Sequence, residues 1–288
     1  TVGPAGPGGG CDQLGRAVEQ GARGGGLVGN FQFENVPGAG GTVGLPRFLA
    51  TRRNRPDALI VAGSIMIGAA ITNRSPVSMA NLTPIARLTQ ETGAVVVAAN
   101  SDFRTIGDLI AALRSNPGAV SVAGGSGGGI DHITLGLMLR AVGRQAREGS
   151  FVAFAGGGPS LAAIMGGQVK AGISGWAEFS EQIRAGRLRP LATTGETRID
   201  PNVPTLKESG VDVVTSNWRG VFGAPGIQPA ARAALTTMIT EMHALPAWRA
   251  LAEQRGWEDA FLTGEAFDRF IAQDTRDTEA ILRELGLA

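Results

Sequence analysis

Short apolar runs alternate with longer amphipathic stretches along most of the chain. A short apolar run between turn residues is typical of a buried strand, and apolar positions at helical spacing are typical of a helix. The alternation therefore predicts an α/β architecture. The predicted strands are 31–36, 58–62, 94–99, 119–123, 151–154, 171–174, 190–194 and 211–215, and the predicted helices are 12–22, 42–52, 106–115, 131–142, 159–165, 178–185 and 205–209.

The last seventy or so residues have a different pattern, with helical periodicity and almost no strand signal. Helices are predicted over 229–245, 247–254 and 264–285. Pro229 suits a first helical turn, and Gly256 and Gly286 suit the residues that follow a helix. A helical tail after an α/β region predicts that the chain returns to cover an earlier domain.

A length of 288 residues is enough for two domains that each have a core. We place the crossings between them near residues 100–101 and 216–218. The first domain then comprises residues 1–100 and 218–288, and the second comprises residues 101–217. Two crossing segments make a hinge, and a cleft between two α/β lobes is a preferred place for a ligand.

Four glycine clusters stand where helices are predicted to begin, at residues 3–10, 37–41, 124–129 and 156–160. Glycine allows the backbone to approach a ligand closely, and the first N–H groups of a helix have no partner within it. Together they allow the main chain alone to hold an anion. The clusters therefore indicate binding rather than catalysis.

The candidate ligand residues follow from these clusters and from the predicted strand ends. Pro4 and Pro7 stiffen the first loop, which lowers the ordering cost of binding, although a tight turn without a ligand would use the same residues. Asp12 and Asp131 are candidates for a ligand hydroxyl, but an aspartate in a first turn more often caps its helix. Ser126 is the best side-chain donor. The full set is Ala5, Gly6, Gly8, Gly9, Gly10, Asp12, Ser64, Ser126, Gly128, Gly129, Asp131, Gly157, Gly158, Ser174 and Gly175.

Three larger side chains have open interpretations. Trp176 could line the pocket and Trp218 could lie at the crossing between the domains, or each could simply pack in a core. Arg219 could pair with a ligand carboxylate through two parallel hydrogen bonds, or it could form a salt bridge at the hinge.

Charge and cysteine content exclude several classes. A net charge of +1, with Lys170 and Lys207 as the only lysines, argues against nucleic acid. The single cysteine, Cys11, rules out an intrachain disulfide and a cysteine-based zinc site. We find no metal-ligand spacing and expect no cofactor. Because the chain opens abruptly before its first glycine loop, we expect a preceding segment to have been trimmed, so the lack of a targeting signal is uninformative.

Two enzyme classes, a serine hydrolase and a dinucleotide-binding enzyme, have partial motifs in the sequence. Residues 124–128 satisfy the Gly-x-Ser-x-Gly pattern of a nucleophile elbow, with Ser126 as the nucleophile. The only histidines, His132 and His243, are poorly placed along the chain to serve as its base. A dinucleotide site would need glycine or alanine where Cys11 stands, and Glu34 lies inside its strand rather than beyond its end. A serine hydrolase stays as a remote alternative, and we expect no enzyme.

Several motifs occur in order along essentially the whole chain. The sequence has PAGPGGG at 4–10, ENVPGAGG at 34–41, LTPIARL at 82–88, GGQV at 166–169, QIRAGRLRPLA at 182–192 and VPTLKE at 203–208. These motifs resemble the substrate-binding proteins of tripartite tricarboxylate transporters, the Bug or TctC-like family. Segments 130–132, 154–158, 174–179 and 217–220 resemble the branch associated with citrate and related carboxylates.

The resemblance implies a two-lobed periplasmic-binding-protein fold of type II, a Venus flytrap with a ligand cleft between its lobes. It also implies a periplasmic receptor, expected to be a monomer, that delivers a citrate-like tri- or dicarboxylate to the membrane permease subunits. Cys11 stands where that branch often has tryptophan, so the acid itself stays open. An aromatic, phthalate-like carboxylate is the alternative ligand, and a role in sensing is the alternative to transport.

Overall fold

The computed structural model describes residues 1–7, 10–29, 31–125, 127–154 and 157–288. Three predicted ligand residues, Gly8, Gly9 and Ser126, lie outside the described residues. The chain forms two compact units: unit 1 comprises residues 1–90 and 218–277, and unit 2 comprises residues 91–217 and 278–288. Residues 91–100 and 278–288 therefore group with unit 2, whereas the sequence analysis places them in the first domain.

Unit 1 contains a six-stranded mixed sheet. Two parallel pairs, β1 with β2 and β1 with β3, form one part, and antiparallel strands complete it. Its order is β11 (Glu258–Thr263), β4 (Thr83–Gln90), β10 (Arg219–Gly223), β3 (Leu59–Gly63), β1 (Val2–Gly3) and β2 (Glu34–Asn35).

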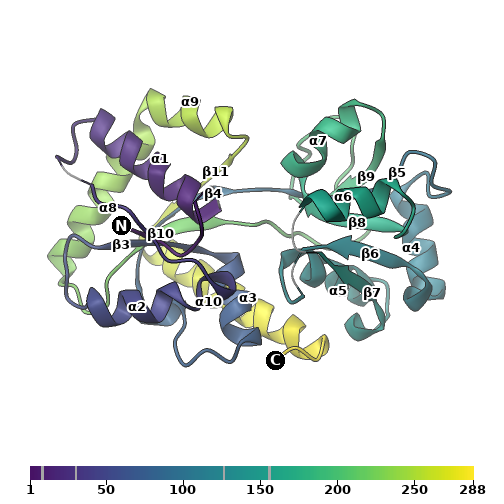
Figure 1. The fold of residues 1–288 in the computed structure, drawn as a ribbon, viewed down its shortest axis with the longest axis horizontal. Coiled ribbons are helices and arrows are strands. Elements are labelled where there is room, and N and C mark those ends of the chain that lie inside the picture. Colours follow the sequence, from purple (N-terminus) through teal and green to yellow (C-terminus); the bar gives the residue numbers. More distant parts are fainter. Residues whose placement is uncertain (8–9, 30, 126, 155–156) are drawn as a thin grey trace. The chain divides into compact units, whose positions relative to one another are not determined.

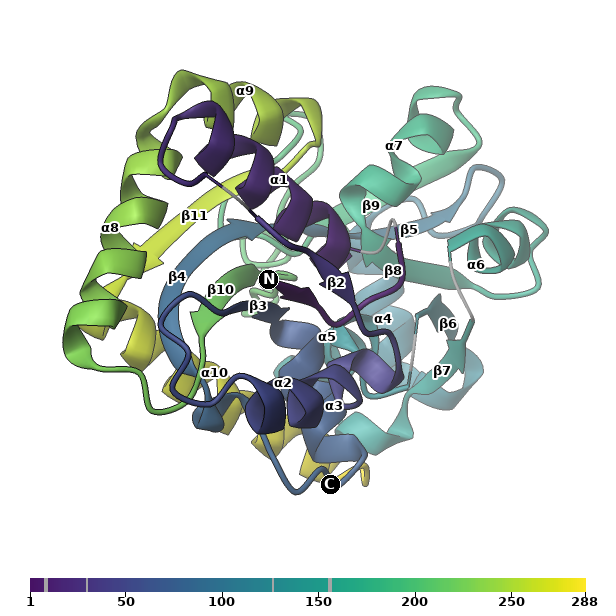
Figure 2. The ribbon, with the colours of Figure 1, turned by 60° about the vertical axis from the view of Figure 1, so that its left-hand side comes forward.

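Helices cover both faces of the first sheet (Figures 1 and 2). Alternate residues of a strand point to opposite faces, and β3 is buried along its whole length. Leu59 and Val61 pack with one set of helices, and Ile60 and Ala62 pack with the other. The first set is α1 (Gly10–Gly24), α8 (Pro229–Ala244) and α9 (Pro246–Gln254), and the second is α2 (Gly44–Thr51), α3 (Ser64–Thr72) and α10 (Gly264–Glu284).

Unit 2 repeats this plan around a five-stranded sheet (Figure 1). The strand order is β7 (Ser150–Ala153), β6 (Ser121–Gly124), β8 (Ala171–Gly175), β5 (Gly93–Ala98) and β9 (Leu188–Thr193). Val95 and Val97 pack with α4 (Ile106–Ser115) and α5 (Ile130–Ala141). Ala94 and Val96 pack on the opposite face with α6 (Gly157–Met165) and α7 (Trp176–Arg184).

The two sheets share one topology. In each, parallel strands lie in the order second, first, third, and an antiparallel strand separates the third from the next: β10 in unit 1 and β5 in unit 2. Each inserted strand is the first strand after a crossing of the unit boundary. The two units and their mixed sheets confirm the predicted two-lobed α/β fold class.

Several predicted elements are wrong. Residues 205–209 form turns, and residues 211–215 form no strand. Residues 31–36 are reduced to the two-residue strand β2. Four strands, β1, β4, β10 and β11, and the helix α3 had no counterpart in the prediction. Short 3₁₀ turns at Ala39–Gly41, Met79–Asn81, Pro117–Ala119 and Ala146–Glu148 complete the regular structure.

Candidate functional site

The predicted ligand residues fall on one edge of each sheet. In unit 1 they lie where β1 leads into α1 and where β3 leads into α3. In unit 2 they lie where β6 leads into α5, β7 into α6 and β8 into α7. All five junctions are at the carboxyl ends of parallel strands, the edge at which open α/β sheets bind ligands.

In unit 1, the first glycine loop is tied to the neighbouring strand by Asn35. The Nδ2 atom of Asn35 donates to the carbonyl of Ala5 at 3.0 Å and to Oδ1 of Asp12 at 2.9 Å. No atom of the described residues lies within 4 Å of the position that a Cβ on Gly6 would take. The loop is therefore held at Ala5 and has open space at Gly6.

Asp12 lies in the first turn of α1 and is 3% exposed. Its Oδ1 accepts from Nε of Arg16 at 2.9 Å as well as from Asn35. A carboxylate in a first turn is favoured by the helix dipole, and here it also joins the helix to β2. These contacts support a structural role for Asp12, and its contact with a ligand stays a prediction.

A buried arginine stands at the start of α1. Arg219 is 8% exposed, and a Cβ on Gly10 would lie 2.5 Å from its Cζ and Nη2 atoms. Burial raises the pKa of the Cys11 thiol, and the positive charge of Arg219 opposes that rise. Glycine at position 10 therefore lets a guanidinium lie against the N-terminal end of a helix, where positive charge already gathers.

Ser64 begins α3 directly after β3. Its amide donates to the carbonyl of Trp218 at 3.2 Å. Trp218 is 1% exposed, and its Nε1 donates to Asp274 at 2.8 Å, so this ring packs in the core of unit 1. The interpretation of Trp218 as a packed side chain is confirmed.

In unit 2, Asp131 contacts the glycine loop that precedes α5. It lies in the first turn of α5, and its Oδ2 accepts from the amide of Gly125 at 2.8 Å. Burial raises the pKa of Asp131 to about 6, and the charge of Glu178 adds to that rise, whereas the Gly125 N–H lowers it. A fraction of Asp131 therefore carries a proton near pH 6.

His132 holds the same loop from the next position. Its Nδ1 accepts from the amide of Gly128 at 3.1 Å, and its ring stacks on Phe151 with centroids 4.3 Å apart. Burial lowers the pKa of His132, which favours the neutral ring that can accept this bond. The amides of Gly125 and Gly128 thus donate to side chains in the first turn of α5. The contact of Gly128 with a ligand stays a prediction.

The first turn of α5 supplies other amides. Gly129 is the N-cap, and its carbonyl accepts from Ile133 at 3.0 Å, which is the first bond of the helix. The amides of Ile130, Asp131 and His132 consequently have no acceptor within the helix. They lie beside Gly129, which the sequence analysis selected.

The remaining candidates end or begin other elements of unit 2. Gly157 and Gly158 are the first residues of α6, and Ser174 and Gly175 end β8. Ser160, 4% exposed in α6, has a buried hydroxyl with no partner among the residues that the structure describes. Whether these residues contact a ligand stays a prediction.

Two exposed apolar side chains on the unit 1 edge were missed. Val43 precedes α2 and is 51% exposed, and Ile65, in the first turn of α3, is 47% exposed. A Cβ on Gly40 would lie 3.6 Å from Cγ2 of Ile65. Ile65 lies in an apolar run, and such a run does not show which of its side chains is exposed to solvent. Its position directly after the helix start is the one signal in the sequence that could have identified it.

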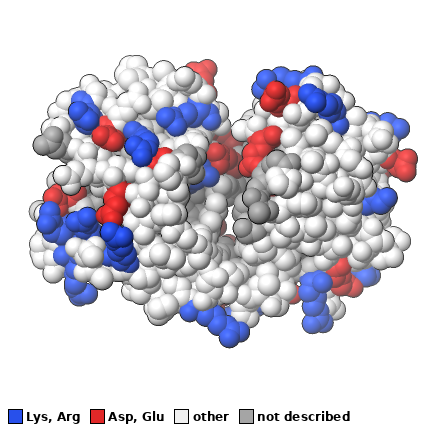
Figure 3. All heavy atoms as spheres, in the orientation of Figure 1, with Lys and Arg blue, Asp and Glu red and all other residues white. Residues whose placement is uncertain are grey.

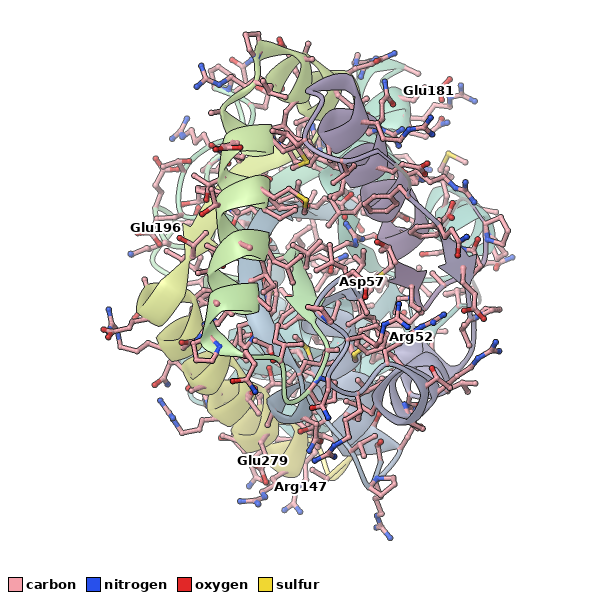
Figure 4. The ribbon with its side chains drawn as sticks, turned by 90° about the vertical axis from the view of Figure 1, so that its left-hand side faces the viewer. Arg52, Asp57, Arg147, Glu181, Glu196 and Glu279 are labelled. Atoms are coloured by element: carbon pink, nitrogen blue, oxygen red, sulfur yellow. The ribbon has the colours of Figure 1, made fainter. Side chains whose placement is uncertain are left out.

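Two cavities lined by described residues lie away from these strand ends. One, of about 490 Å³, is lined in unit 2 by residues near the start of β6 and β8, including Val120, Val169 and Lys170. The other, of about 1050 Å³, lies in unit 1 near the start of β3 and includes Arg52 and Asp57, which Figure 4 labels. Both lie at the amino ends of parallel strands, so neither is the predicted site.

Surface charge and the grouping of metal-ligating side chains do not indicate a further site among the described residues. On the face drawn in Figure 3, acidic and basic side chains of each unit are interspersed. In the described ranges, no three His, Cys, Asp or Glu side chains gather to hold a metal ion. None of the helices described there is long and apolar enough to cross a membrane.

The contacts of the two histidines do not support the serine hydrolase alternative. His132 uses Nδ1 for Gly128, and its ring is stacked on Phe151. His243 lies in unit 1, where its Nε2 contacts Asp259 at 2.9 Å and its ring stacks on Phe261. The predicted nucleophile, Ser126, lies outside the described residues.

Comparison with known proteins gives one consistent result. Residues 16–287 match the family described as tripartite tricarboxylate transporter family receptor, TctC. The chain is 29% identical over 262 residues to the UPF0065 protein in the gbd 5′ region of Cupriavidus necator, covering 88% of this chain and 77% of that protein.

Solved structures agree with this match. A TctC solute-binding protein from Polaromonas superposes with a TM-score of 0.85 at 25% identity, covering 99% of this chain and 97% of that one. MatC from Rhodopseudomonas palustris, solved with bound malate, superposes with a TM-score of 0.71 at 22% identity, covering 99% and 97%. The chain, whose two units carry glycine loops at the carboxyl edges of their sheets, therefore belongs to the family of tripartite tricarboxylate transporter receptors.

Proposed function

We propose that this receptor captures a small organic polycarboxylate, a citrate-like tri- or dicarboxylate, outside the cytoplasm and delivers it to the permease subunits of a tripartite transporter. Membership of the receptor family supports the transport role, and the malate in MatC supports a carboxylate ligand. On this proposal the protein is a monomeric binding protein rather than an enzyme, and its location is periplasmic.

The observation that carries the proposal is the position of Arg219 against the first turn of α1. A buried guanidinium and a helix N-terminus both favour a negative charge in the same place. The guanidinium has five N–H donors, so it can bind a carboxylate and keep contacts with its own chain. Main-chain donors at Ala5, Gly6 and Gly10 complete the proposed carboxylate position in unit 1.

The first turn of α5 is a second proposed carboxylate position, in unit 2. Its amides, together with Gly129, are placed by Asp131 and His132, which hold the preceding loop. Because each unit by itself offers such a position, we expect a polycarboxylate rather than a monocarboxylate.

A thermal-shift and calorimetric screen with malate, citrate and phthalate tests the ligand class. We expect malate or citrate to raise the melting temperature in a concentration-dependent way, because a ligand that binds only the folded state stabilises it. Stabilisation by phthalate alone would favour the aromatic alternative. If none of a broad panel of carboxylates stabilises the protein, the proposed ligand class is wrong.

Replacing Gly10 tests whether Arg219, which lies against the first turn of α1, contributes to ligand binding. In Gly10→Ala, the new methyl group occupies space beside the Arg219 guanidinium, so that side chain must shift. We expect the Kd for the stabilising acid to rise at least ~10-fold, in line with loss of a charged hydrogen bond. Gly24→Ala, at the other end of α1 where nothing lies within 4 Å, is the matched control. Unchanged affinity in Gly10→Ala would contradict the role of Arg219.

A further inference from the structure

Two of the three segments at which the chain passes from one unit to the other pair with each other. The amide of Glu91 donates to the carbonyl of Asn217 at 3.1 Å, and the amide of Asn217 donates back at 3.0 Å. Thr92 and Ser216 continue this antiparallel pairing as an isolated bridge. Residues 91–92 and 216–217, here called the connecting ribbon, are therefore one hydrogen-bonded piece at the edge of unit 2.

A chain of buried threonine hydroxyls starts next to this ribbon. The amide of Gly93 donates to Oγ1 of Thr194 at 2.9 Å, and the Thr194 hydroxyl donates to the carbonyl of Thr215 at 2.7 Å. The exposed fractions of Thr194 and Thr215 are 1% and 8%. Both residues are thus buried with their hydrogen bonds made, which gives such a network a defined geometry.

The chain ends at the first turn of α5. The Oγ1 atoms of Thr215 and Thr134 are 2.9 Å apart, and the Thr134 hydroxyl donates to the carbonyl of Ile130 at 2.8 Å. Because the one proton of Thr134 goes to Ile130, the Thr215 hydroxyl is the donor between the two threonines. Thr134 is 1% exposed, so water does not replace these bonds.

The start of α7 is fixed to the same ribbon. The amide of Trp176, the first residue of α7, donates to the carbonyl of Thr92 at 2.9 Å. The start of α7 is therefore bonded directly to Thr92, and the start of α5 is bonded to Thr215 through the Thr134 hydroxyl.

We propose that Thr134, Thr194 and Thr215 are positioning residues, which hold the ligand-facing first turn of α5 in register with the connecting ribbon. The network joins a predicted ligand loop to two of the three segments that cross the unit boundary. The affinity part of this inference rests on the proposed function. The positioning part concerns hydrogen bonds within unit 2 and is measurable without a ligand.

Thr215→Val is the informative variant because it keeps the shape and both backbone bonds of residue 215 and removes only the hydroxyl. Thr215→Ser keeps the hydroxyl and should restore the wild-type behaviour. Thr236→Val in α8 is the control, since it removes a threonine hydroxyl from unit 1 that, like the Thr134 hydroxyl, donates to a carbonyl four residues earlier. Each variant is measured by amide hydrogen exchange without ligand and by calorimetry with malate and citrate.

In Thr215→Val we expect amide exchange over residues 129–134 to accelerate at least about threefold, with α1 unchanged. We also expect the Kd for the acid that binds to rise about five- to tenfold. Wild-type exchange over these residues would overturn the proposal, and so would faster exchange with wild-type affinity, which indicates a merely structural network. If the wild-type protein binds no carboxylate, the proposed function fails, and the exchange experiment still decides the positioning.

Discussion

Asp131 illustrates how a single carboxyl group serves a binding loop through its own chain. It accepts from the Gly125 amide and lies partly buried near Glu178, which together with burial raises its pKa to about 6. Aspartate and glycine at these positions were both visible in the sequence. The hydrogen bond from the Gly125 amide to the Asp131 side chain was not.

The free energy of unfolding of Asp131→Asn is predicted to increase relative to that of the wild type as the pH rises. The folded-state pKa of Asp131 lies above its unfolded value near 3.8, so its stabilising contribution is complete below that value and is lost as the pH rises through about 6. Asparagine keeps an acceptor for Gly125 and does not ionise. Thermal unfolding at pH 5 and pH 7.5 should show the variant gaining about 1.4 kcal/mol on the wild type at the higher pH, because about one pKa unit of the shift lies between these two values. A constant difference would contradict the raised pKa.

At the scale of elements, the missed strands share one property: they lack a local β signal. In β4, Pro84 and Arg87 interrupt the apolar pattern, and in β10 two glycines flank Val221 and Phe222. Each is nevertheless paired on both sides within the first sheet. Strand propensity depends largely on neighbouring strands, so pairing partners distant in sequence decide such cases. Helix α4 is the contrasting case, with observed bounds equal to those predicted.

The agreement for α4 has a local cause, the capping box of Thr105 and Asp108. The Asp108 carboxylate accepts from the amides of Arg104 and Thr105 and from the Thr105 hydroxyl. Such boxes stabilise a helix start independently of tertiary contacts.

Asp108→Asn is predicted to show the opposite pH dependence to Asp131→Asn. Bonds from the two amides lower the pKa of Asp108, so its contribution is present above its unfolded value near 3.8 and is lost as the pH falls below that value. The variant should melt below the wild type at pH 7, and the gap should close near pH 3. A gap that widens toward acid would refute this assignment.

At the scale of the whole chain, α10 contributes to both units. Residues 264–277 belong to unit 1, where Phe267 and Ile271 are core residues, and residues 278–284 belong to unit 2. In unit 2, a Cβ on Gly136 of α5 would lie 3.4 Å from Cδ1 of Ile281. The chain therefore crosses the boundary between the units three times, whereas the sequence analysis expected two crossings.

Ile281→Ala is predicted to destabilise the protein by about 2–4 kcal/mol, because Ile281 is 1% exposed and its loss leaves a cavity against α5. Denaturant unfolding gives the magnitude, and hydrogen exchange should locate the loss in α5. Arg283→Ala removes an exposed ion pair with Glu279 and serves as the control, with an expected change below about 0.5 kcal/mol. Equal effects of the two variants would show that Ile281 does not hold α5.

Local periodicity, helix starts and motifs in order along the chain are enough to predict the α/β class, most helices, the glycine loops and the family. Only the folded chain shows the pairing of β4, β10 and β11, the burial of Arg219 beside Gly10 and the hydrogen bonds from the Gly125 and Gly128 amides to Asp131 and His132. A hydrogen-bond donor can be assigned only when every acceptor within reach is known, and the fold positions those acceptors.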